Sequence, residues 1–207
     1  NIFNINLNFS DLIFLYKQII LKKSFLRSTH NLFLKKKINI KGKSADLGSG
    51  NNFEYHKYII KTKHTIDRFD FHKVDKKSFK LNLEKKFNLK KKYECIILFN
   101  VMEHIFDKEN LVYSISKSLK KRGKLEIFVP FMFRYHSDPN DYIRPTHTYL
   151  INLLEKNGFN VKSTLIAVGP MPVILEILFK YLKFDILKFF VSVLFFFINK
   201  FFNFFSK

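Results

Sequence analysis

The sequence predicts an α/β protein with a mostly parallel central sheet flanked by helices. Two short segments dense in apolar and β-branched residues, 93–99 (YECIILF) and 124–129 (KLEIFV), are typical of buried strands. A helical pattern over 108–119 separates them, and such alternation favours parallel strands joined by crossover helices. The length of 207 residues and a hydrophobic content of 47% suit one main domain with a real core.

Three regions are expected along the chain: an N-terminal helical segment at 1–40, the α/β domain at 41–168, and an apolar, aromatic-rich helical tail at 169–207. The spacing of apolar residues predicts helix within 9–34 and again over 146–157. Thr146 and Gly158 suit the start and end of the second of these helices, and Gly123 is expected to end the helix of 108–119. Further strands are expected at 43–47, 64–67 and 160–168.

The net charge of +20 points to an anionic partner, either a membrane surface or a nucleic acid. Only five of the 37 basic residues are Arg, the residue that most often reads nucleic acids through paired hydrogen bonds, so nucleic acid is the weaker of the two. The single cysteine, Cys95, lies in an apolar run and forms no internal disulfide, which fits the reducing cytoplasm and a place in the core.

The tail is rich in Phe, and polar residues recur along 171–205 at helical spacing, as in helices with a narrow polar stripe. Its longest run without charge, 189–199, would be ~16 Å long as a helix, too short to span a bilayer. The pattern therefore predicts either a helix lying in an anionic membrane interface, which would make the protein peripheral to the membrane, or packing on protein, including a homodimer.

A small-residue loop, ADLGSG at 45–50, follows one of the predicted strands and is expected to lead into a helix at about Asn51. Gly48 and Gly50 indicate a sharp backbone turn or the close approach of a polar ligand, at the sheet edge where open parallel sheets bind ligands. Asp67 comes about 20 residues after Asp46, which is the spacing of the acid that binds ribose hydroxyls in nucleotide-binding sheets.

An ordered series of motifs makes residues 40–160 resemble class I S-adenosylmethionine-dependent methyltransferases of the type-11 group. The series is ADLGSG, TID, LNLEKKF, YECIILFNVMEHI, KKRGKLEIFVP and RYHSDPNDYIRPT. The resemblance implies a Rossmann-like methyltransferase fold with S-adenosylmethionine as cofactor.

By this resemblance, Gly48 and Gly50 hold the methionine part of the cofactor and Asp46 orients its amino group. Asp67 binds the ribose hydroxyls. Asn82, where the family usually has Asp, contacts the adenine amine, and Asn100 lines the cofactor cleft.

The acceptor side is expected in the loop after Pro130, which is unusually rich in His, Asp and Arg. A hydroxyl acceptor must lose a proton, so His104, His136 and Asp141 are candidate catalytic residues. Arg134, Tyr142 and Arg144 are candidates for substrate binding. Each of these residues taken alone has a structural alternative, as a surface group, a salt-bridge partner or, for His104, a side chain packed beneath the cofactor. No metal site is predicted, because the spacing of His136 and His147 is not that of helical ligands.

The sequence thus predicts a methyltransferase, most simply acting on oxygen of a small-molecule, glycan or lipid-linked acceptor. Two alternatives remain: an RNA methyltransferase, favoured by the net charge, and a non-catalytic membrane-associated module. The module is allowed by Asn52 and Asn82, which replace residues usual in the family.

Overall fold

The computed structural model describes residues 8–51, 53–60, 65–72 and 75–165, with isolated positions at 167, 173–174, 176–177, 190 and 194. The chain divides into two compact units, residues 39–164 and residues 1–38 with 165–207. The apolar tail predicted for 169–207 lies almost entirely outside the described residues. Among those that are described, no helix is long and apolar enough to span a membrane.

The N-terminal segment forms two helices, α1 (Phe9–Ile20) and α2 (Phe25–Lys37), where the sequence predicted one helical region. Asn8 and Asp11 form a reciprocal capping box at the start of α1, and the Ser24 hydroxyl accepts a hydrogen bond from the Arg27 amide at the start of α2. The second cap explains the break, because Ser24 begins a new helix three residues after Leu21 ends the first.

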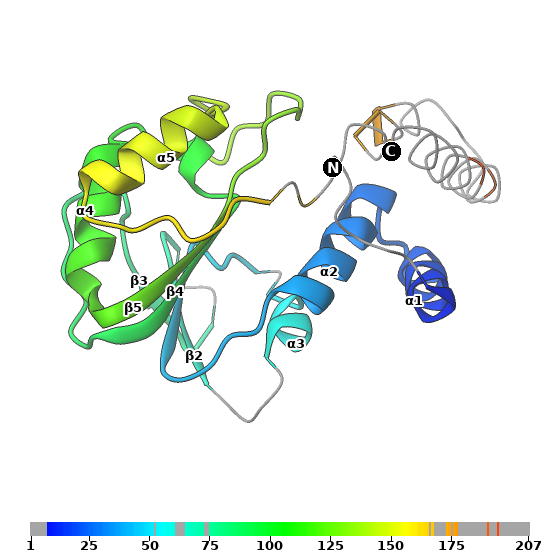
Figure 1. The fold of residues 1–207 in the computed structure, drawn as a ribbon, viewed down its shortest axis with the longest axis horizontal. Helices are drawn as coiled ribbons and strands as arrows, with labels where there is room; N and C mark the ends of the chain where they lie inside the picture. Colours follow the sequence, from blue (N-terminus) through cyan, green and yellow to red (C-terminus); the bar gives the residue numbers. More distant parts are fainter. Residues whose placement is uncertain are drawn as a thin grey trace. The chain divides into compact units, whose positions relative to one another are not determined.

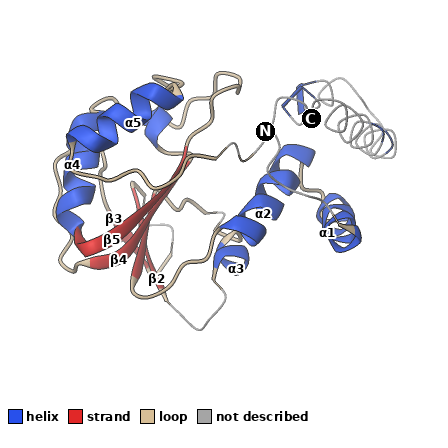
Figure 2. Ribbon diagram, in the orientation of Figure 1, coloured by secondary structure: helices blue, strands red, loops and turns tan. Residues whose placement is uncertain are grey.

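The α/β unit contains a five-stranded sheet in the order β3-β2-β1-β4-β5, and every neighbouring pair of strands is parallel. The strands are β1 (Ser44–Leu47), β2 (Ile66–Asp70), β3 (Ser78–Lys80), β4 (Tyr93–Phe99) and β5 (Leu119–Phe128). Figures 1 and 2 show the strands as one twisted layer, with α4 (Lys108–Ser118) and α5 (His147–Lys156) on the same side of it. The predicted α/β class is confirmed.

The core lies between the sheet and these two helices. Ile96 and Leu98 of β4 pack with Leu111 and Ile115 of α4, and all four side chains are buried. Burying such a side chain stabilises the fold by ~1.5–3 kcal/mol. The core therefore fixes β1 and β4 at the centre of the sheet, and with them the loops that leave their carboxyl ends.

The local structure departs from the predictions in four places. Strand β5 begins directly after α4, so Gly123 lies within the strand and does not end the helix. Residues 160–165 form no strand, and β3 was not predicted. The helix expected after the glycine loop is reduced, in the described residues, to the single turn α3 (His56–Ile59). Short apolar segments in the sequence do not define where helices and strands begin and end, because pairing with neighbouring strands decides which residues join the sheet.

Candidate functional site

The loop after β1 is a tight turn that favours glycine. Gly48 and Gly50 have φ of +75° and +56°, in the left-handed region that side chains disfavour. A Cβ on Gly48 would lie 2.4 Å from Cγ2 of Val101, so the turn also packs closely on the segment that follows β4. The Gly48 amide donates a hydrogen bond to the Phe69 carbonyl at 2.8 Å, which ties the turn to the neighbouring strand β2.

Asp46, at the carboxyl end of β1, is fully buried, and only one of its two carboxylate oxygens has hydrogen-bond partners in the described residues. Its Oδ2 accepts a hydrogen bond from the Tyr55 hydroxyl and lies 2.6 Å from Nε2 of His56. Its Oδ1 is buried and finds no hydrogen-bond partner among the residues that the structure describes, and the same holds for the hydroxyl of Ser49. Buried polar atoms without a partner are costly, so their occurrence beside the glycine turn indicates that a polar ligand completes the site.

The acid at the carboxyl end of β2 is Asp70, and the prediction for Asp67 is wrong in its position. Asp67 is the second residue of β2, near the amino end of the sheet, and its carboxylate accepts a hydrogen bond from the Tyr93 hydroxyl at 2.8 Å. Asp70 ends the strand, and its Oδ2 accepts a hydrogen bond from the Gly50 amide at 2.9 Å. Because β2 extends to residue 70, three residues beyond the predicted end, the acid beside the glycine turn is Asp70.

Asn82 and Asn100 lie at the same edge of the sheet. Leu81 donates its amide to the Asp70 carbonyl at 2.7 Å, which sets Asn82 just beyond the end of β3 and beside the end of β2. The Asn82 side chain accepts a hydrogen bond from the Glu84 amide at 2.9 Å. Asn100 follows β4 with φ of +54°. The edge therefore gathers Asp46, both glycines, Asn82 and Asn100, with Asp70 in the place that the sequence analysis gave to Asp67.

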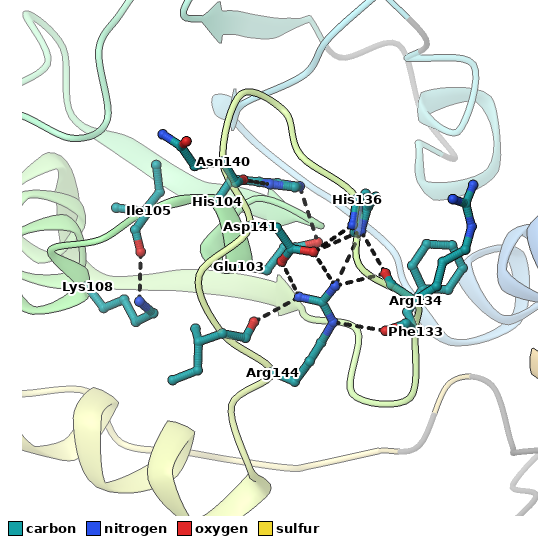
Figure 3. A network of polar contacts seen from close by, with 11 residues as sticks. Glu103, His104, Ile105, Lys108, Phe133, Arg134, His136, Asn140, Asp141 and Arg144 are labelled. Atoms are coloured by element: carbon teal, nitrogen blue, oxygen red, sulfur yellow. Dashed lines mark hydrogen bonds and ion pairs between the residues drawn. The ribbon is translucent and has the colours of Figure 1, made fainter.

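The loop after β5 is held by Arg144, as Figure 3 shows. Both terminal nitrogens of its guanidinium donate to the Asp141 carboxylate, with Nη2 at 2.6 Å from Oδ2. It also donates to the backbone carbonyls of Phe133, Arg134 and Ile143, and its Nη2 lies 3.3 Å from Nδ1 of His136. With its donors so engaged, Arg144 positions the loop, and the prediction that it binds substrate is not supported.

The Asp141 carboxylate is likewise occupied by hydrogen bonds within the loop. The paired hydrogen bonds from Arg144 hold the pKa of Asp141 well below its usual range, which makes this carboxylate a poor base. It also accepts the His136 amide at 2.8 Å. Asp141 is thus a positioning residue in this arrangement, and the prediction of a catalytic role for it is replaced by one of orienting His136.

His104 and His136, far apart in the sequence, come together above the end of β4. Their rings meet edge to face with centroids 4.9 Å apart. His104 lies in the 3-10 turn η1 (Met102–His104), and its Nδ1 is 2.5 Å from the Asn140 carbonyl oxygen. The neighbouring Glu103, which the sequence did not single out, is fully buried, and neither of its carboxylate oxygens has a hydrogen-bond partner among the described residues.

The two other candidates for substrate binding face outward. Arg134 is exposed, with its guanidinium carbon 6.0 Å from the centre of the Phe133 ring, and Figure 3 shows this side chain directed away from the histidines. Tyr142 is 44% exposed and its ring meets that of Phe106 at 5.4 Å. The structure therefore brings together His104, His136 and Asp141, and leaves Arg134 and Tyr142 at the surface.

The sequence of residues 24–164 matches the methyltransferase-domain family, over more than half of the chain. The chain belongs to the S-adenosylmethionine-dependent methyltransferases. The predicted family and Rossmann-like methyltransferase fold are confirmed, and S-adenosylmethionine is the cofactor of this family. A comparison with curated proteins finds no match.

Among solved structures, the [4+2]-cyclase SpnF is similar with a TM-score of 0.52 and 10% identity, over 69% of this chain and 61% of the cyclase. This methyltransferase domain thus spans about three fifths of the length of that protein. An O-methyltransferase from a polyketide synthase of Brevibacillus brevis, bound to S-adenosylhomocysteine, has a TM-score of 0.48 and 16% identity, over 91% of this chain and 73% of that chain. A methyltransferase of Listeria monocytogenes has a TM-score of 0.48 and 15% identity, over 66% of this chain and 86% of that chain.

Proposed function

We propose that this methyltransferase domain transfers the methyl group of S-adenosylmethionine to an oxygen atom of a small-molecule, glycan or lipid-linked acceptor. The observation that carries the proposal is the hydrogen bond from the Gly50 amide to Asp70. It sets a bare backbone turn and a strand-end carboxylate side by side, at the edge where parallel sheets bind nucleosides.

The residues at this edge fit the cofactor. The carboxylate of Asp70 suits the two ribose hydroxyls, because each carboxylate oxygen can accept more than one hydrogen bond. The unpartnered Oδ1 of Asp46 suits the ammonium group of the methionine part, with the turn at Gly48 close by. Asn82 would meet the adenine amine and Asn100 would line the cleft. The cofactor supplies an electrophilic methyl group on a sulfonium, and the protein's task is to align it with the acceptor.

The cluster of His104 and His136 supports methyl transfer to an oxygen atom of the acceptor. A hydroxyl must give up its proton as its oxygen is methylated, and this cluster can hold the hydroxyl and remove that proton. The Arg144–Asp141 pair fixes the loop that carries His136, so the cluster is formed before the acceptor arrives. Preformed geometry of this kind is what in-line transfer requires.

For the place of the protein in the cell, we propose the cytoplasm, with the tail of residues 171–207 at an anionic membrane interface. The support is the tail's narrow polar stripe with lysines and the buried, unpaired thiol of Cys95. Sedimentation with vesicles containing anionic lipid tests this. Pelleting of the full chain that falls when the tail lysines are changed to Glu is expected, and equal pelleting of both forms contradicts it.

Calorimetry with S-adenosylhomocysteine tests the cofactor half of the proposal. One equivalent should bind, and no binding at millimolar ligand would favour the non-catalytic module. The acceptor half is tested by incubating the protein with methyl-labelled S-adenosylmethionine and a cell extract, then separating lipid, glycan, small-molecule and RNA fractions. Label outside RNA is expected, while label confined to RNA would support an RNA methyltransferase instead.

A further inference from the structure

Glu103, His104 and His136 form a group that the function proposed above does not fully use. Each can offer one ligand atom, and these three atoms all lie within 4.8 Å of one another. Two of the residues come from the turn that follows β4, and the third comes from the loop after β5. Three donors from two segments lie close enough together for small side-chain adjustments to bring them around one metal ion.

Glu103 supplies the independent indication of a ligand. Its carboxylate is fully buried, and in the part of the chain that the structure describes neither Oε1 nor Oε2 has a hydrogen-bond partner. A buried carboxylate is ordinarily paired with a cation or bound to a metal. An unpaired buried charge destabilises the fold by on the order of several kcal/mol.

The hydrogen bonds of the two histidines leave one nitrogen of each available. Nδ1 of His104 lies 2.5 Å from the Asn140 carbonyl, which fixes the proton on that nitrogen, and Nε2 faces Oε1 of Glu103 at 3.8 Å. Nδ1 of His136 lies 3.2 Å from the Arg134 carbonyl and 3.5 Å from Oδ2 of Asp141. Imidazoles that bind metals are typically oriented in this way, by a carbonyl or carboxylate on the opposite nitrogen.

The charge balance also suits a cation. The guanidinium of Arg144 approaches the group, with Nη2 3.3 Å from Nδ1 of His136, but its charge is paired with Asp141. Among the described residues, the ion-pair contact of the Glu103 carboxylate is with Nε2 of His104 at 3.8 Å, and a metal ion bound between them would replace that contact.

We propose that Glu103, His104 and His136 bind a divalent first-row transition-metal ion such as Zn²⁺, Mn²⁺ or Fe²⁺. Two imidazoles and one carboxylate suit these ions better than Mg²⁺ or Ca²⁺, which prefer oxygen ligands alone. Three protein ligands leave coordination positions open. If the chain transfers methyl groups as proposed, an acceptor oxygen takes an open position, and the histidines contact the acceptor through the ion. That role rests on the proposed function, whereas the metal site itself does not.

The test is a titration of the tag-free full chain, freed of metal with a chelator, with Co²⁺ followed by Zn²⁺. We expect one equivalent of Co²⁺ to bind with visible d–d absorption, and Zn²⁺ to displace it. Glu103→Gln and His136→Asn should each weaken Co²⁺ binding by about tenfold or more. His147→Asn is the matched control, since His147 lies outside the group with Nε2 at 3.1 Å from Oγ1 of Thr164, and this variant should bind as the wild type does.

Unchanged Co²⁺ affinity in both variants, or loss of affinity in His147→Asn as well, would mean an adventitious ion only and would overturn the site. If Glu103→Gln does not fold, as judged by circular dichroism, the partly exposed His136 decides the question. Binding of S-adenosylhomocysteine is measured on the same metal-free samples. Cofactor binding without metal binding refutes the metal site alone, and metal binding without cofactor binding refutes the proposed function alone.

Discussion

The amino and carboxyl edges of the parallel sheet differ in whether their acidic side chains have hydrogen-bond partners. At the amino edge, Asp67 of β2 pairs with the hydroxyl of Tyr93 at 2.8 Å and lies 4.0 Å from Nζ of Lys91. At the carboxyl edge, one oxygen of Asp46 and both oxygens of Glu103 are buried without a hydrogen-bond partner. Asp67 at the amino edge is satisfied within the chain, whereas the carboxyl edge has polar groups for which the described residues provide no partner.

This difference separates stability from function on one scaffold. Groups that are satisfied within the fold contribute to its free energy of unfolding, whereas unpartnered buried groups reduce that free energy and persist where a ligand uses them. The two edges should therefore respond differently to substitution. Changes at the amino edge should lower stability alone, and changes at the carboxyl edge should lower ligand binding as well.

The largest loss of stability is expected for Gly48→Ala. The new Cβ would clash with Val101, and the alanine would have to keep the left-handed φ of the glycine. Together these effects should lower the free energy of unfolding by about 2–4 kcal/mol. Gly158→Ala is the matched control, since Gly158 has φ of +83° but nothing within 4 Å of the added atom. Urea unfolding of both variants measures the difference, and equal losses would mean that the turn is not packed on Val101.

The next largest effect is expected for Asp141→Asn. The substitution leaves the guanidinium of Arg144 without its charged partner, and the loop that carries His136 loses its anchor. We expect a loss of about 2–3 kcal/mol in unfolding free energy, at the lower end of the range for broken buried ion pairs because Arg144 remains partly exposed.

The comparison for that prediction is Glu109→Gln. Glu109 pairs with Lys156 at 2.7 Å, but both side chains are more than half exposed. Such surface pairs contribute about 0–1 kcal/mol. If Glu109→Gln cost as much as Asp141→Asn in the same urea titration, the Arg144–Asp141 pair would not be the special anchor of the loop.

The smallest effect is expected at the amino edge. Tyr93→Phe removes the hydrogen bond to Asp67 and should lower the free energy of unfolding by about 1 kcal/mol. The affinity for S-adenosylhomocysteine should stay within twofold of the wild type, because the hydroxyl is at the edge opposite to the glycine turn. A large loss of affinity with little loss of stability would break the distinction between the edges.

Much of the fold could be predicted because its signals are local. The strand 93–99 was predicted with its observed limits, since an apolar run between polar segments leaves little choice. Thr146 was predicted to cap α5, and its hydroxyl accepts the Tyr149 amide as expected. The end of β2 could not be predicted in this way, because the alternating run IDRFD offers two acids and only pairing with β1 decides how far the strand extends.

The candidate site shows the same division. Gly48, Gly50 and Asp46 were singled out because small residues and an acid after a strand form a short motif. Glu103 was missed because its approach to His136 depends on the path of a loop, which the sequence does not show. The apolar residues around it in VMEHI were the one sequence signal that could have drawn attention to it.

The measurement that tests the account most directly is the affinity for S-adenosylhomocysteine of Asp70→Asn and Asp67→Asn, two substitutions of the same kind three positions apart on one strand. We predict that Asp70→Asn weakens binding by about tenfold or more, because it removes the carboxylate beside the Gly50 amide, a loss of ~1–3 kcal/mol. Asp67→Asn should bind as the wild type does. Weaker binding in Asp67→Asn with unchanged binding in Asp70→Asn would contradict the assignment of the cofactor to the carboxyl edge.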